Sequence, residues 1–446
     1  MEFFDRTHEI KRLQQIRELS EKSAQLTVVT GRRRIGKTSM IIKALEEENF
    51  LYVFVTKGTE KELCRDMAQE MKIKLKLPLV GDVSRMKDLL ALLMETAKEK
   101  PLTLVMDEFQ NLQYVNPAIF SYIQKLWDLN KNQAKINFVV CGSVASMMNR
   151  LFRDYKEPLY ARHTAMMKVE PFETQVLTDI IKSFNPKASG EDVLALFLLT
   201  GGVAKYVEHL MDHGATDRET MLRTVVDKDS VFLLEGKSLL IEEFGRDYGR
   251  YFDILKLIAE GHNSRSDLEG ILGVEISGHL SRLENDYGIL SKSKPLLQKS
   301  NNRNIRYHIK DHFMRFWFRF FYKYNTFIEA NAFNQLRMVV ERDYTTYSGK
   351  VLEDFFKQRL RESGRFTLVG SWWDRRGENE IDIIAADDLA KSVTFFEVKR
   401  QRKEIDFAIL RSKAQHFLQT TGAMADYDVE YRGLCLEDVI IGDGSR

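Results

Sequence analysis

The residues QLTVVT at 25–30 and GRRRIGKT at 31–38 decide the fold of the first part of this chain. QLTVVT predicts a short buried strand, and GRRRIGKT matches the pattern G-x-x-x-x-G-K-[ST] without departure. A loop of this kind wraps backbone N–H groups around phosphate oxygens, while its Lys reaches the β- and γ-phosphates and its Thr hydroxyl faces Mg²⁺. The residues after it predict a helix, whose N-terminal dipole favours bound phosphate. We therefore expect nucleotide binding by Gly31, Arg32, Arg33, Arg34, Ile35, Gly36, Lys37, Thr38 and Ser39.

An acidic pair follows the phosphate loop by roughly 70 residues. The apolar stretch LTLVM at 102–106 predicts a strand that ends in Asp107 and Glu108. Asp107 is placed to hold Mg²⁺ through its waters, together with Thr38. Glu108 is placed to polarise an attacking water as general base, with Lys37 on the phosphates. The pair predicts binding and hydrolysis of ATP or GTP.

Strand and helix patterns alternate along the first part of the chain. We predict an amphipathic helix over 5–22 and a helix over 86–100. Further strands are predicted at 52–56, 101–109, 136–143 and 164–172. Strands that alternate with helices indicate an α/β fold with a parallel sheet covered on both faces. We assign residues 1–172 to this core.

The remaining chain predicts three further parts. Residues 173–243 lack strong strand signals and predict a helical lid. Residues 244–345 predict three short helices and a hairpin, which is the winged-helix pattern, followed by an aromatic connecting helix at 311–330. Residues 346–446 predict a small α/β domain, with helices at 349–363 and 408–422 and strands at 377–388 and 392–400.

The last part carries two acids and a lysine in a pattern suited to phosphodiester chemistry. Asp382 lies in one predicted strand, Glu397 and Lys399 share one face of the next, and Glu353 lies in the preceding helix. A nuclease core needs acids such as Asp382 and Glu397 to hold Mg²⁺ and a Lys to orient water. Two other interpretations stay open: an edge strand with solvated charge, and a nuclease fold that has lost catalysis.

Basic residues gather on the predicted wing and the helix after it. Eight Lys or Arg face one acid, Asp311, between Gly288 and Arg319. Such a surface can neutralise DNA phosphates. The predicted recognition helix at 275–287 is of mixed charge, and many winged helices pack only against protein, so both interpretations stay open. The basic residues are Lys292, Lys294, Lys299, Arg303, Arg306, Lys310, Arg315 and Arg319.

The composition bounds the class of protein. The chain has 446 residues, 67 Lys and Arg against 65 Asp and Glu, and 44% hydrophobic residues, which is typical of a globular protein of two to four domains. Three dispersed cysteines exclude a disulfide framework and a clustered zinc site, so a metal here is expected on oxygen ligands. The charged start and the lack of long apolar runs predict a complete, cytoplasmic chain that is not inserted in a membrane.

Several motifs together resemble those of the archaeal-type ATPase family, a relative of AAA+ and of signalling STAND ATPases. They cover about residues 1–240. Some members of the family continue into a winged helix and a domain similar to PD-(D/E)xK nucleases. This chain departs from the nuclease pattern in one place, since it has Glu380-Ile381-Asp382 where the pattern has Pro-Asp. The motifs are FFDRTHEIKRLQQI, GRRRIGKTS, LTLVMDEFQNL, FVVCGSVASMM, PLYARHTAMMKVEPF and LTGGVAKYVEHL.

The resemblance implies further roles. Ser143 falls where such ATPases sense the γ-phosphate, although it could instead cap the next helix. Arg162 matches a recurrent Arg suited to developing phosphate charge, with Arg150 and Arg153 as competitors and surface salt bridging as the alternative. Arg6 matches the opening motif, expected near the base of the nucleotide. Gly201-Gly202 is either a nucleotide sensor or a helix stop.

The leading hypothesis is an ATPase, with ATP and Mg²⁺, coupled to DNA binding or Mg²⁺-dependent DNA cleavage. The alternative is a STAND-type switch that changes its oligomeric state with nucleotide and binds a protein partner without cleaving DNA. A metabolic kinase is disfavoured, because sensor and lid motifs follow the phosphate loop.

Overall fold

The computed structural model describes residues 3–76, 83–244, 248–297, 304–374 and 378–441. The chain forms two compact units. The N-terminal unit is Asp5–Glu170, and the C-terminal unit is Pro171–Arg446 together with Met1–Phe4. In the described ranges, no helix combines the length and apolar character needed to cross a membrane.

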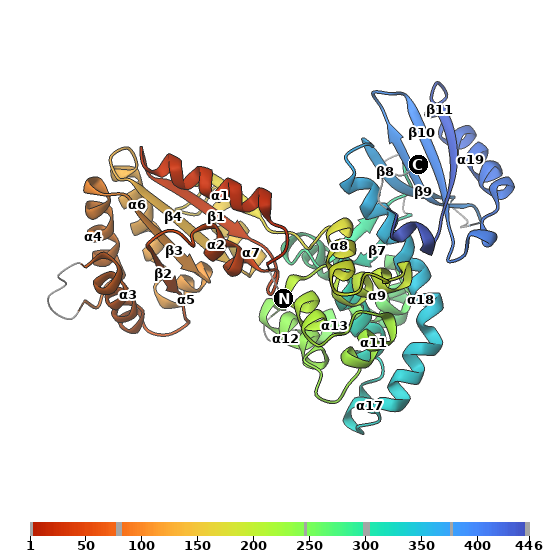
Figure 1. Ribbon diagram of the computed structural model, residues 1–446, viewed down its shortest axis with the longest axis horizontal. Helices are drawn as coiled ribbons and strands as arrows, with labels where there is room; N and C mark the ends of the chain where they lie inside the picture. Colours follow the sequence, from red (N-terminus) through yellow and green to blue (C-terminus); the bar gives the residue numbers. More distant parts are fainter. Residues whose placement is uncertain (1–2, 77–82, 245–247, 298–303, 375–377, 442–446) are drawn as a thin grey trace. The chain divides into compact units, whose positions relative to one another are not determined.

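A five-stranded sheet forms the centre of the N-terminal unit (Figure 1). All its neighbouring strands are parallel, and the order β2-β3-β4-β1-β5 places β4 between β1 and β3. The predicted parallel α/β sheet is therefore confirmed. Its strands are β1 (Gln25–Thr30), β2 (Phe50–Phe54), β3 (Leu102–Asp107), β4 (Ile136–Gly142) and β5 (Ala165–Lys168).

Helices cover both faces of this sheet. Every residue of β1 and of β3 is buried, as expected for strands enclosed on two sides. One face packs on α3, α4 and α6 in a single apolar cluster, and α1 and α2 pack together beside β1. The helices are α1 (Thr7–Ser20), α2 (Lys37–Ala44), α3 (Glu60–Leu75), α4 (Met86–Glu99), α5 (Leu112–Val115), α6 (Ile119–Asn130) and α7 (Ala145–Arg153).

The helices predicted as a lid belong to the C-terminal unit. Gly201 ends α9 in a left-handed conformation (φ 56°), and its N–H donates to Phe197 O at 2.8 Å. This bears out the helix-stop interpretation of Gly201. The helices are α8 (Thr174–Phe184), α9 (Gly190–Thr200), α10 (Ala204–Asp212), α11 (Arg218–Val225) and α12 (Phe232–Phe244).

The predicted three helices and hairpin are present. Strands β6 and β7 pair antiparallel, with Leu290 opposite Ile309. The third helix is short and continues as the π-helical segment η3, which carries the mixed charges of the predicted recognition helix. The elements are α13 (Tyr248–Glu260), α14 (Arg265–Leu272), α15 (Ser277–Ser281), η3 (Arg282–Asp286), β6 (Leu290–Ser293) and β7 (Arg306–Ile309).

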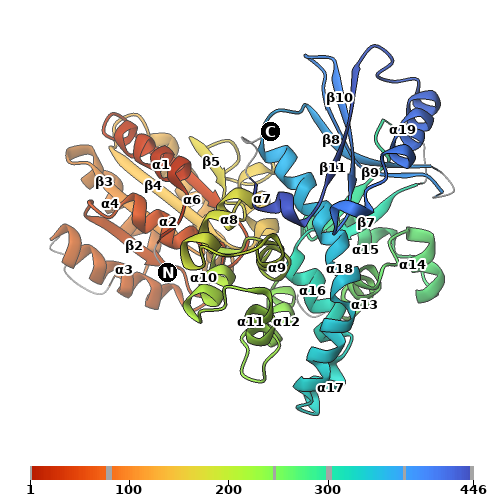
Figure 2. The ribbon, with the colours of Figure 1, turned by 45° about the vertical axis from the view of Figure 1, so that its right-hand side comes forward.

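The aromatic segment is mostly buried in its first two parts, α16 (His312–Phe316) and the π-helical η4 (Trp317–Tyr322), and has no buried residue in its third part, α17 (Asn325–Glu329). The π-helical part follows α16 directly, and α17 follows η4 after a short turn. The 30-residue helix α18 (Phe333–Glu362) follows and runs to the C-terminal sheet (Figure 2). The boundary that we predicted between residues 345 and 346 lies inside α18. Fully buried rings of the segment are Phe313, Phe316, Phe318, Phe320 and Phe321.

A four-stranded mixed sheet ends the chain, with the order β11-β10-β9-β8. Only β10 and β11 pair parallel. Helix α19 (Phe407–Thr421) covers one face, where Phe395 packs on Phe417. The sequence did not predict β8 or β11, because one contains Gly370 and the other alternates polar residues. The strands are β8 (Leu368–Trp373), β9 (Glu380–Asp387), β10 (Ser392–Val398) and β11 (Asp428–Leu434).

Candidate functional site

The phosphate loop joins β1 to α2, and its backbone needs glycine at two places. Gly36 precedes α2 with φ 92°, in the left-handed region. A Cβ on Gly31 (φ 155°) would lie 2.6 Å from Val169 O, so the loop approaches the residue after β5 more closely than a side chain allows. These constraints give the loop the tight curvature that aims N–H groups at an anion.

Lys37 is buried and turned back onto the loop. Its Nζ donates to Gly31 O at 2.9 Å and to Arg32 O at 3.0 Å. Burial lowers the pKa of Lys37, and the nearby Cys141, Glu108 and Asp107 oppose that shift. A phosphate beside Nζ would favour the charged ammonium, so the loop is electrostatically suited to an anion.

Asp107 is bound at the end of β3 by three donors. Thr38 Oγ1 donates to Asp107 Oδ2 at 2.6 Å, Tyr52 OH donates to the same oxygen at 2.9 Å, and Glu108 N donates to Oδ1 at 2.8 Å. The structure thus brings together the two predicted metal ligands, Thr38 and Asp107. Two oxygen donors beside a phosphate loop suit Mg²⁺, which takes its other ligands from phosphates and water.

Sequence reasoning missed Tyr52 in this arrangement. Its strand, β2, was predicted, but only the sheet order places β2 beside β3, with Tyr52 opposite Val105. Burial and the charge of Asp107 raise the pKa of Tyr52, so the phenol stays protonated and acts as a donor. The sequence YVFV predicts a strand but does not indicate which other strand pairs with it or which side chain Tyr52 contacts.

Glu108 is held by two side-chain donors. Its backbone lies in the left-handed region (φ 53°), and its Oε2 accepts from Ser143 Oγ at 2.9 Å and from Gln110 Nε2. Gly142 makes room for this, since a Cβ there would lie 2.5 Å from Gln110 Oε1. Sequence reasoning missed Gln110, although it lies two residues after Glu108 in the same motif.

Ser143 contacts Glu108 and does not cap the next helix. Helix α7 begins at Ala145, its N-cap is Val144, and no side chain caps it. The capping interpretation of Ser143 is therefore wrong. Ser143 directly follows β4, the strand between β1 and β3, so its hydroxyl lies at the carboxyl edge of the sheet.

Arg6 lies beside the phosphate loop. The side chain is buried, and its guanidinium donates to Glu170 O at 2.6 Å and to Ile35 O at 3.5 Å. Glu9 pairs with it at 3.3 Å. Arg6 thus connects the phosphate loop to Glu170 at the end of the unit and is not a solvated residue on a helix face.

Arg162 lies at the opposite edge of the sheet from the phosphate loop. Thr164 N donates to Leu26 O at 2.7 Å, so this segment runs past the start of β1, roughly 16 Å of strand from Gly31. The Arg162 guanidinium forms an ion pair with Asp128 at 2.9 Å. The structure therefore does not bring Arg162 to the phosphate loop of its own chain.

A second constellation lies in the C-terminal unit, where the predicted acids and lysine converge. Lys399 Nζ lies 2.6 Å from Glu397 Oε1 and 3.9 Å from Asp382 Oδ2. Asp382 Oδ2 also accepts from Val398 N at 2.8 Å. Glu353 interacts with this group electrostatically, since the charge of Asp382 raises the pKa of Glu353 and the charge of Glu353 raises the pKa of Lys399.

Burial dominates the electrostatics of this acidic group. Burial raises the pKa of Glu353 to about 7, with Asp382 adding to the shift and Lys357 opposing it. Burial and Glu397 also raise the pKa of Asp382. Burial lowers the pKa of Lys399, but its bond to Glu397 and the charge of Asp382 outweigh this and raise it.

Two further lysines belong to this site and were missed. Lys357 lies 3.5 Å from Glu353, one helical turn on, and Lys413 of α19 lies 3.8 Å from Glu397. The i,i+4 spacing of Glu353 and Lys357 was a usable signal. Among the described residues, no group of three or more His, Cys, Asp or Glu is placed to hold a metal. Any Mg²⁺ here would rest on Asp382 and Glu397, with further ligands from a substrate phosphate and water.

The basic residues of the wing are largely paired within the chain. Arg306 forms an ion pair with Glu380 at 3.0 Å, and its guanidinium lies over the ring of Trp373. Lys292 forms an ion pair with Glu284. Two further ion pairs are Arg315–Asp354 at 2.7 Å and Arg319–Asp343 at 3.1 Å. Lys299 and Arg303 lie outside the described residues. Trp372 and Trp373 are buried, so neither ring is exposed for stacking on a base. The predicted basic surface is therefore weaker than the sequence indicates.

Two families match parts of this chain. Residues 3–210 match the family described as an ATPase domain predominantly from Archaea. Residues 317–414 match a family described as archaeal and bacterial proteins of unknown function. An uncharacterized protein of Methanocaldococcus jannaschii is 29% identical over 406 residues, which cover 89% of this chain and 87% of that protein.

Solved structures share the fold. A Walker-type ATPase of Pyrococcus abyssi is similar with a TM-score of 0.53 at 20% identity, over 71% of this chain and 96% of that one. The ORC2 protein of Aeropyrum pernix, in complexes with ADPNP and ADP, gives a TM-score of 0.47 at 14% identity, over 74% and 96% of the two chains. The first likeness supports the fold of a Walker-type ATPase.

Proposed function

Since residues 3–210 of this chain belong to the family of ATPase domains predominantly from Archaea, we propose that the N-terminal unit binds ATP and hydrolyses it with Glu108 as the general base. The observation that carries this proposal is the double anchoring of the Glu108 carboxylate by Ser143 and Gln110, beside the Thr38–Asp107 pair. A carboxylate held in this way is oriented before a water arrives.

Each residue of the site has a separate role in binding or hydrolysis. Lys37 exchanges its bonds to Gly31 O and Arg32 O for phosphate oxygens, and the loop N–H groups bind the remaining oxygens. Thr38 and Asp107 would hold Mg²⁺, which neutralises phosphate charge when bound. Glu108 accepts a proton from the attacking water, and Ser143 and Gln110 keep its carboxylate in place.

Two variants test this proposal. Lys37→Ala is expected to weaken ATP binding strongly, measured by equilibrium titration. Glu108→Gln is expected to keep ATP binding and to lower the hydrolysis rate by about 10²–10⁴-fold. Hydrolysis by Glu108→Gln at the wild-type rate would overturn the assignment of the base.

The acidic group of the C-terminal unit supports a second activity, Mg²⁺-dependent cleavage of DNA coupled to the ATPase. Asp382 and Glu397 offer carboxylates for the metal, and Lys399 lies 2.6 Å from Glu397, where it can orient a water or stabilise a phosphorane. Glu353, whose pKa is raised to about 7, can exchange a proton near neutral pH.

Plasmid and branched-DNA cleavage with Mg²⁺ tests the second activity. Cleavage is expected for the wild-type chain and is expected to vanish in Asp382→Ala. The matched control is Asp426→Ala, whose carboxylate is 73% exposed and pairs with Lys391 at 3.8 Å. Cleavage that survives in Asp382→Ala comes from elsewhere and removes this site from the proposal.

One observation favours the alternative, a nucleotide-gated switch that binds a protein partner or forms a homo-oligomer. The ion pairs of Arg306, Arg315 and Arg319 with acids of the same chain leave fewer cations for DNA phosphates. A wild-type chain with neither DNA cleavage nor salt-dependent DNA affinity, but with ATP-dependent oligomer size in light scattering, would favour the switch.

A further inference from the structure

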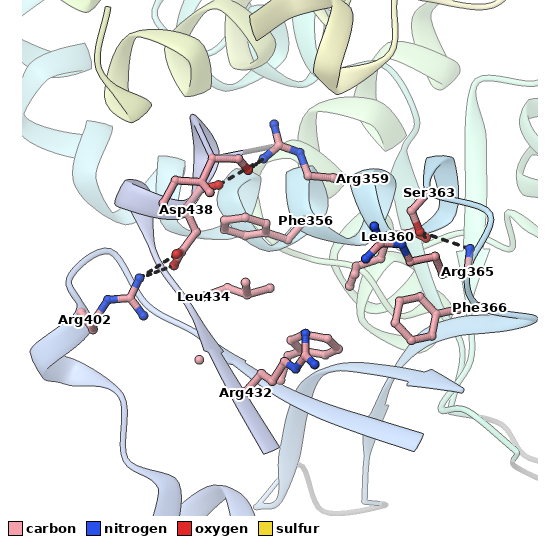
Figure 3. Close-up of a pocket in the computed structure, with 13 residues that line it drawn as sticks. Phe356, Arg359, Leu360, Ser363, Arg365, Phe366, Arg402, Arg432, Leu434 and Asp438 are labelled. Atoms are coloured by element: carbon pink, nitrogen blue, oxygen red, sulfur yellow. Dashed lines mark hydrogen bonds and ion pairs between the residues drawn. The ribbon is translucent and has the colours of Figure 1, made fainter. Parts of the chain in front are cut away.

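A cavity of about 340 Å³ opens on the C-terminal sheet (Figure 3). The end of α18 and the turn after it form one wall, and β10, β11 and two short 3₁₀ segments form the other. Its volume lies in the lower part of the range of small-molecule pockets, about 300–1,000 Å³. The lining residues that carry charge or a ring are Phe356, Arg359, Arg365, Phe366, Phe396, Arg402, Arg432 and Asp438.

The cavity has an apolar floor and a basic rim. The buried rings of Phe356 and Phe396 line the cavity and form its apolar floor. Leu434 is partly exposed and lies between the labelled arginines (Figure 3). Arg365 and Arg432 lie on the rim and are exposed. An aromatic and aliphatic floor below guanidinium groups suits a ligand that is flat and apolar at one end and anionic at the other.

The charges of the lining are strongly unequal. Four arginines and one acid, Asp438, line the cavity. Arg359 is buried and donates to Asp438 O at 3.1 Å and to Ile441 O at 3.4 Å. The Asp438 carboxylate is bound by Arg402 at 2.6 and 2.7 Å and by Cys435 N at 2.9 Å. Arg432 pairs with Glu430 at 2.9 Å, but both side chains are more than half exposed. An exposed pair of this kind is weak, so a phosphate can displace Glu430 from Arg432 at small cost.

The cavity is separate from the acidic group, because the two lie on opposite faces of β10. Phe395 faces α19, where it packs on Phe417, and Glu397 and Lys399 share its face. Phe396 lies on the other face and lines the cavity. The acids proposed for DNA cleavage therefore do not contribute to this site.

We propose that this cavity binds a single nucleotide, with its phosphate on the guanidinium rim and its base over the apolar floor. Guanidinium groups bind phosphate in a bidentate manner, and bases stack on aromatic rings and on Arg planes. The nucleotide has two sources, a free mononucleotide and a residue of a single-stranded nucleic acid, which share this chemistry. The proposal does not depend on hydrolysis at the phosphate loop or on DNA cleavage.

The test uses the full chain carrying Lys37→Ala, so that the phosphate loop does not contribute to binding. AMP, a short oligothymidylate and inorganic phosphate are titrated separately by calorimetry. One site per chain is expected for AMP or the oligonucleotide, and Arg432→Gln or Arg365→Gln is expected to weaken it about tenfold or more. Leu434→Trp, which fills the floor, is expected to abolish binding in a chain that still unfolds cooperatively.

Arg223→Gln is the matched control, because Arg223 is also an exposed arginine paired with a nearby glutamate, Glu219 at 2.6 Å. It is expected to bind as the parent does. Tighter binding of AMP identifies a free nucleotide as the ligand, and tighter binding of the oligonucleotide identifies a strand. Absence of binding for both, equal affinity for inorganic phosphate, or no effect of Arg365→Gln and Arg432→Gln would overturn the proposal.

Discussion

Ser143 Oγ donates a hydrogen bond to Glu108 Oε2 at 2.9 Å, which joins the segment after β4 to the residue after β3. Gln110 Nε2 donates to the same oxygen. The carboxylate proposed as general base is therefore oriented from two sides before any nucleotide arrives. Ser143 is a positioning residue in this arrangement, because it acts through Glu108.

Removing the Ser143 hydroxyl is expected to slow hydrolysis more than it weakens binding. A hydrogen bond to a charged group contributes about 1.5–3 kcal/mol, so Ser143→Ala should lower kcat roughly tenfold to hundredfold. KM for ATP should change little, and Ser143→Thr should restore part of the rate. Steady-state kinetics measure this split, with Ser20→Ala, which loses a bond to Arg17 O at the end of α1, as the control. A rise in KM alone would place Ser143 on the nucleotide instead.

Arg162 is expected to support the fold of its own chain rather than catalysis within it. Its ion pair with Asp128 is partly exposed, and Arg162→Ala and Asp128→Ala should each lower stability by about 0.5–1 kcal/mol, without additivity in the double variant. Thermal unfolding measures the change in stability, and ATPase rates at several protein concentrations measure the effect on hydrolysis. A large loss of ATPase activity in Arg162→Ala alone, growing with protein concentration, would indicate that Arg162 acts on a neighbouring copy.

Glu353 gives the C-terminal unit a pH dependence with a definite sign. Its pKa rises from 4.5 to about 7 on folding, so the folded state binds the proton more tightly than the unfolded state. The contribution of Glu353 to the free energy of unfolding therefore falls as pH rises from about 4.5 to 7. Glu353→Gln cannot ionise, so this pH-dependent fall is expected to be absent in the variant. The facing charges are Lys350, Asp354, Lys357, Asp382 and Lys399.

The thermal midpoint of Glu353→Gln relative to wild type should be higher at pH 8 than at pH 5. The difference should correspond to roughly 1–3 kcal/mol of unfolding free energy. Glu437→Gln, whose side chain is 74% exposed, should show no such trend. Parallel pH profiles for wild type and Glu353→Gln would contradict the buried, protonated state of Glu353 near neutral pH.

Gly190 marks where the C-terminal segment meets α9. A Cβ on Gly190 would lie 1.9 Å from Leu436 O, a backbone atom that cannot turn aside. Gly190→Ala should therefore destabilise the C-terminal unit by about 1–3 kcal/mol, measured by denaturant unfolding. Gly270→Ala in α14 is the matched control, since nothing lies within 4 Å of its Cβ position. The helix propensity of alanine should make that variant as stable as wild type or up to about 1 kcal/mol more so.

The sequence by itself determined the local elements of both units. The phosphate loop, the acids after β3 and the alternation of strands and helices are local patterns, and they predicted the parallel sheet and the position of Lys37, Thr38, Asp107 and Glu108. The same holds for Asp382, Glu397 and Lys399, because a period of two fixes which strand residues share a face. The strands β8 and β11 were not predicted, because the alternation of apolar and polar residues in their sequences is weak.

Only the tertiary structure decided which distant residues meet. Tyr52 reaches Asp107 because β2 pairs with β3, and Ser143 reaches Glu108 because β4 lies between β1 and β3. Arg162 lies far from the phosphate loop because its segment runs past the start of β1, and the wing cations find acids on α18 and β9. Sheet order and ion-pair partners depend on contacts between segments far apart in the chain, and a local pattern does not contain them.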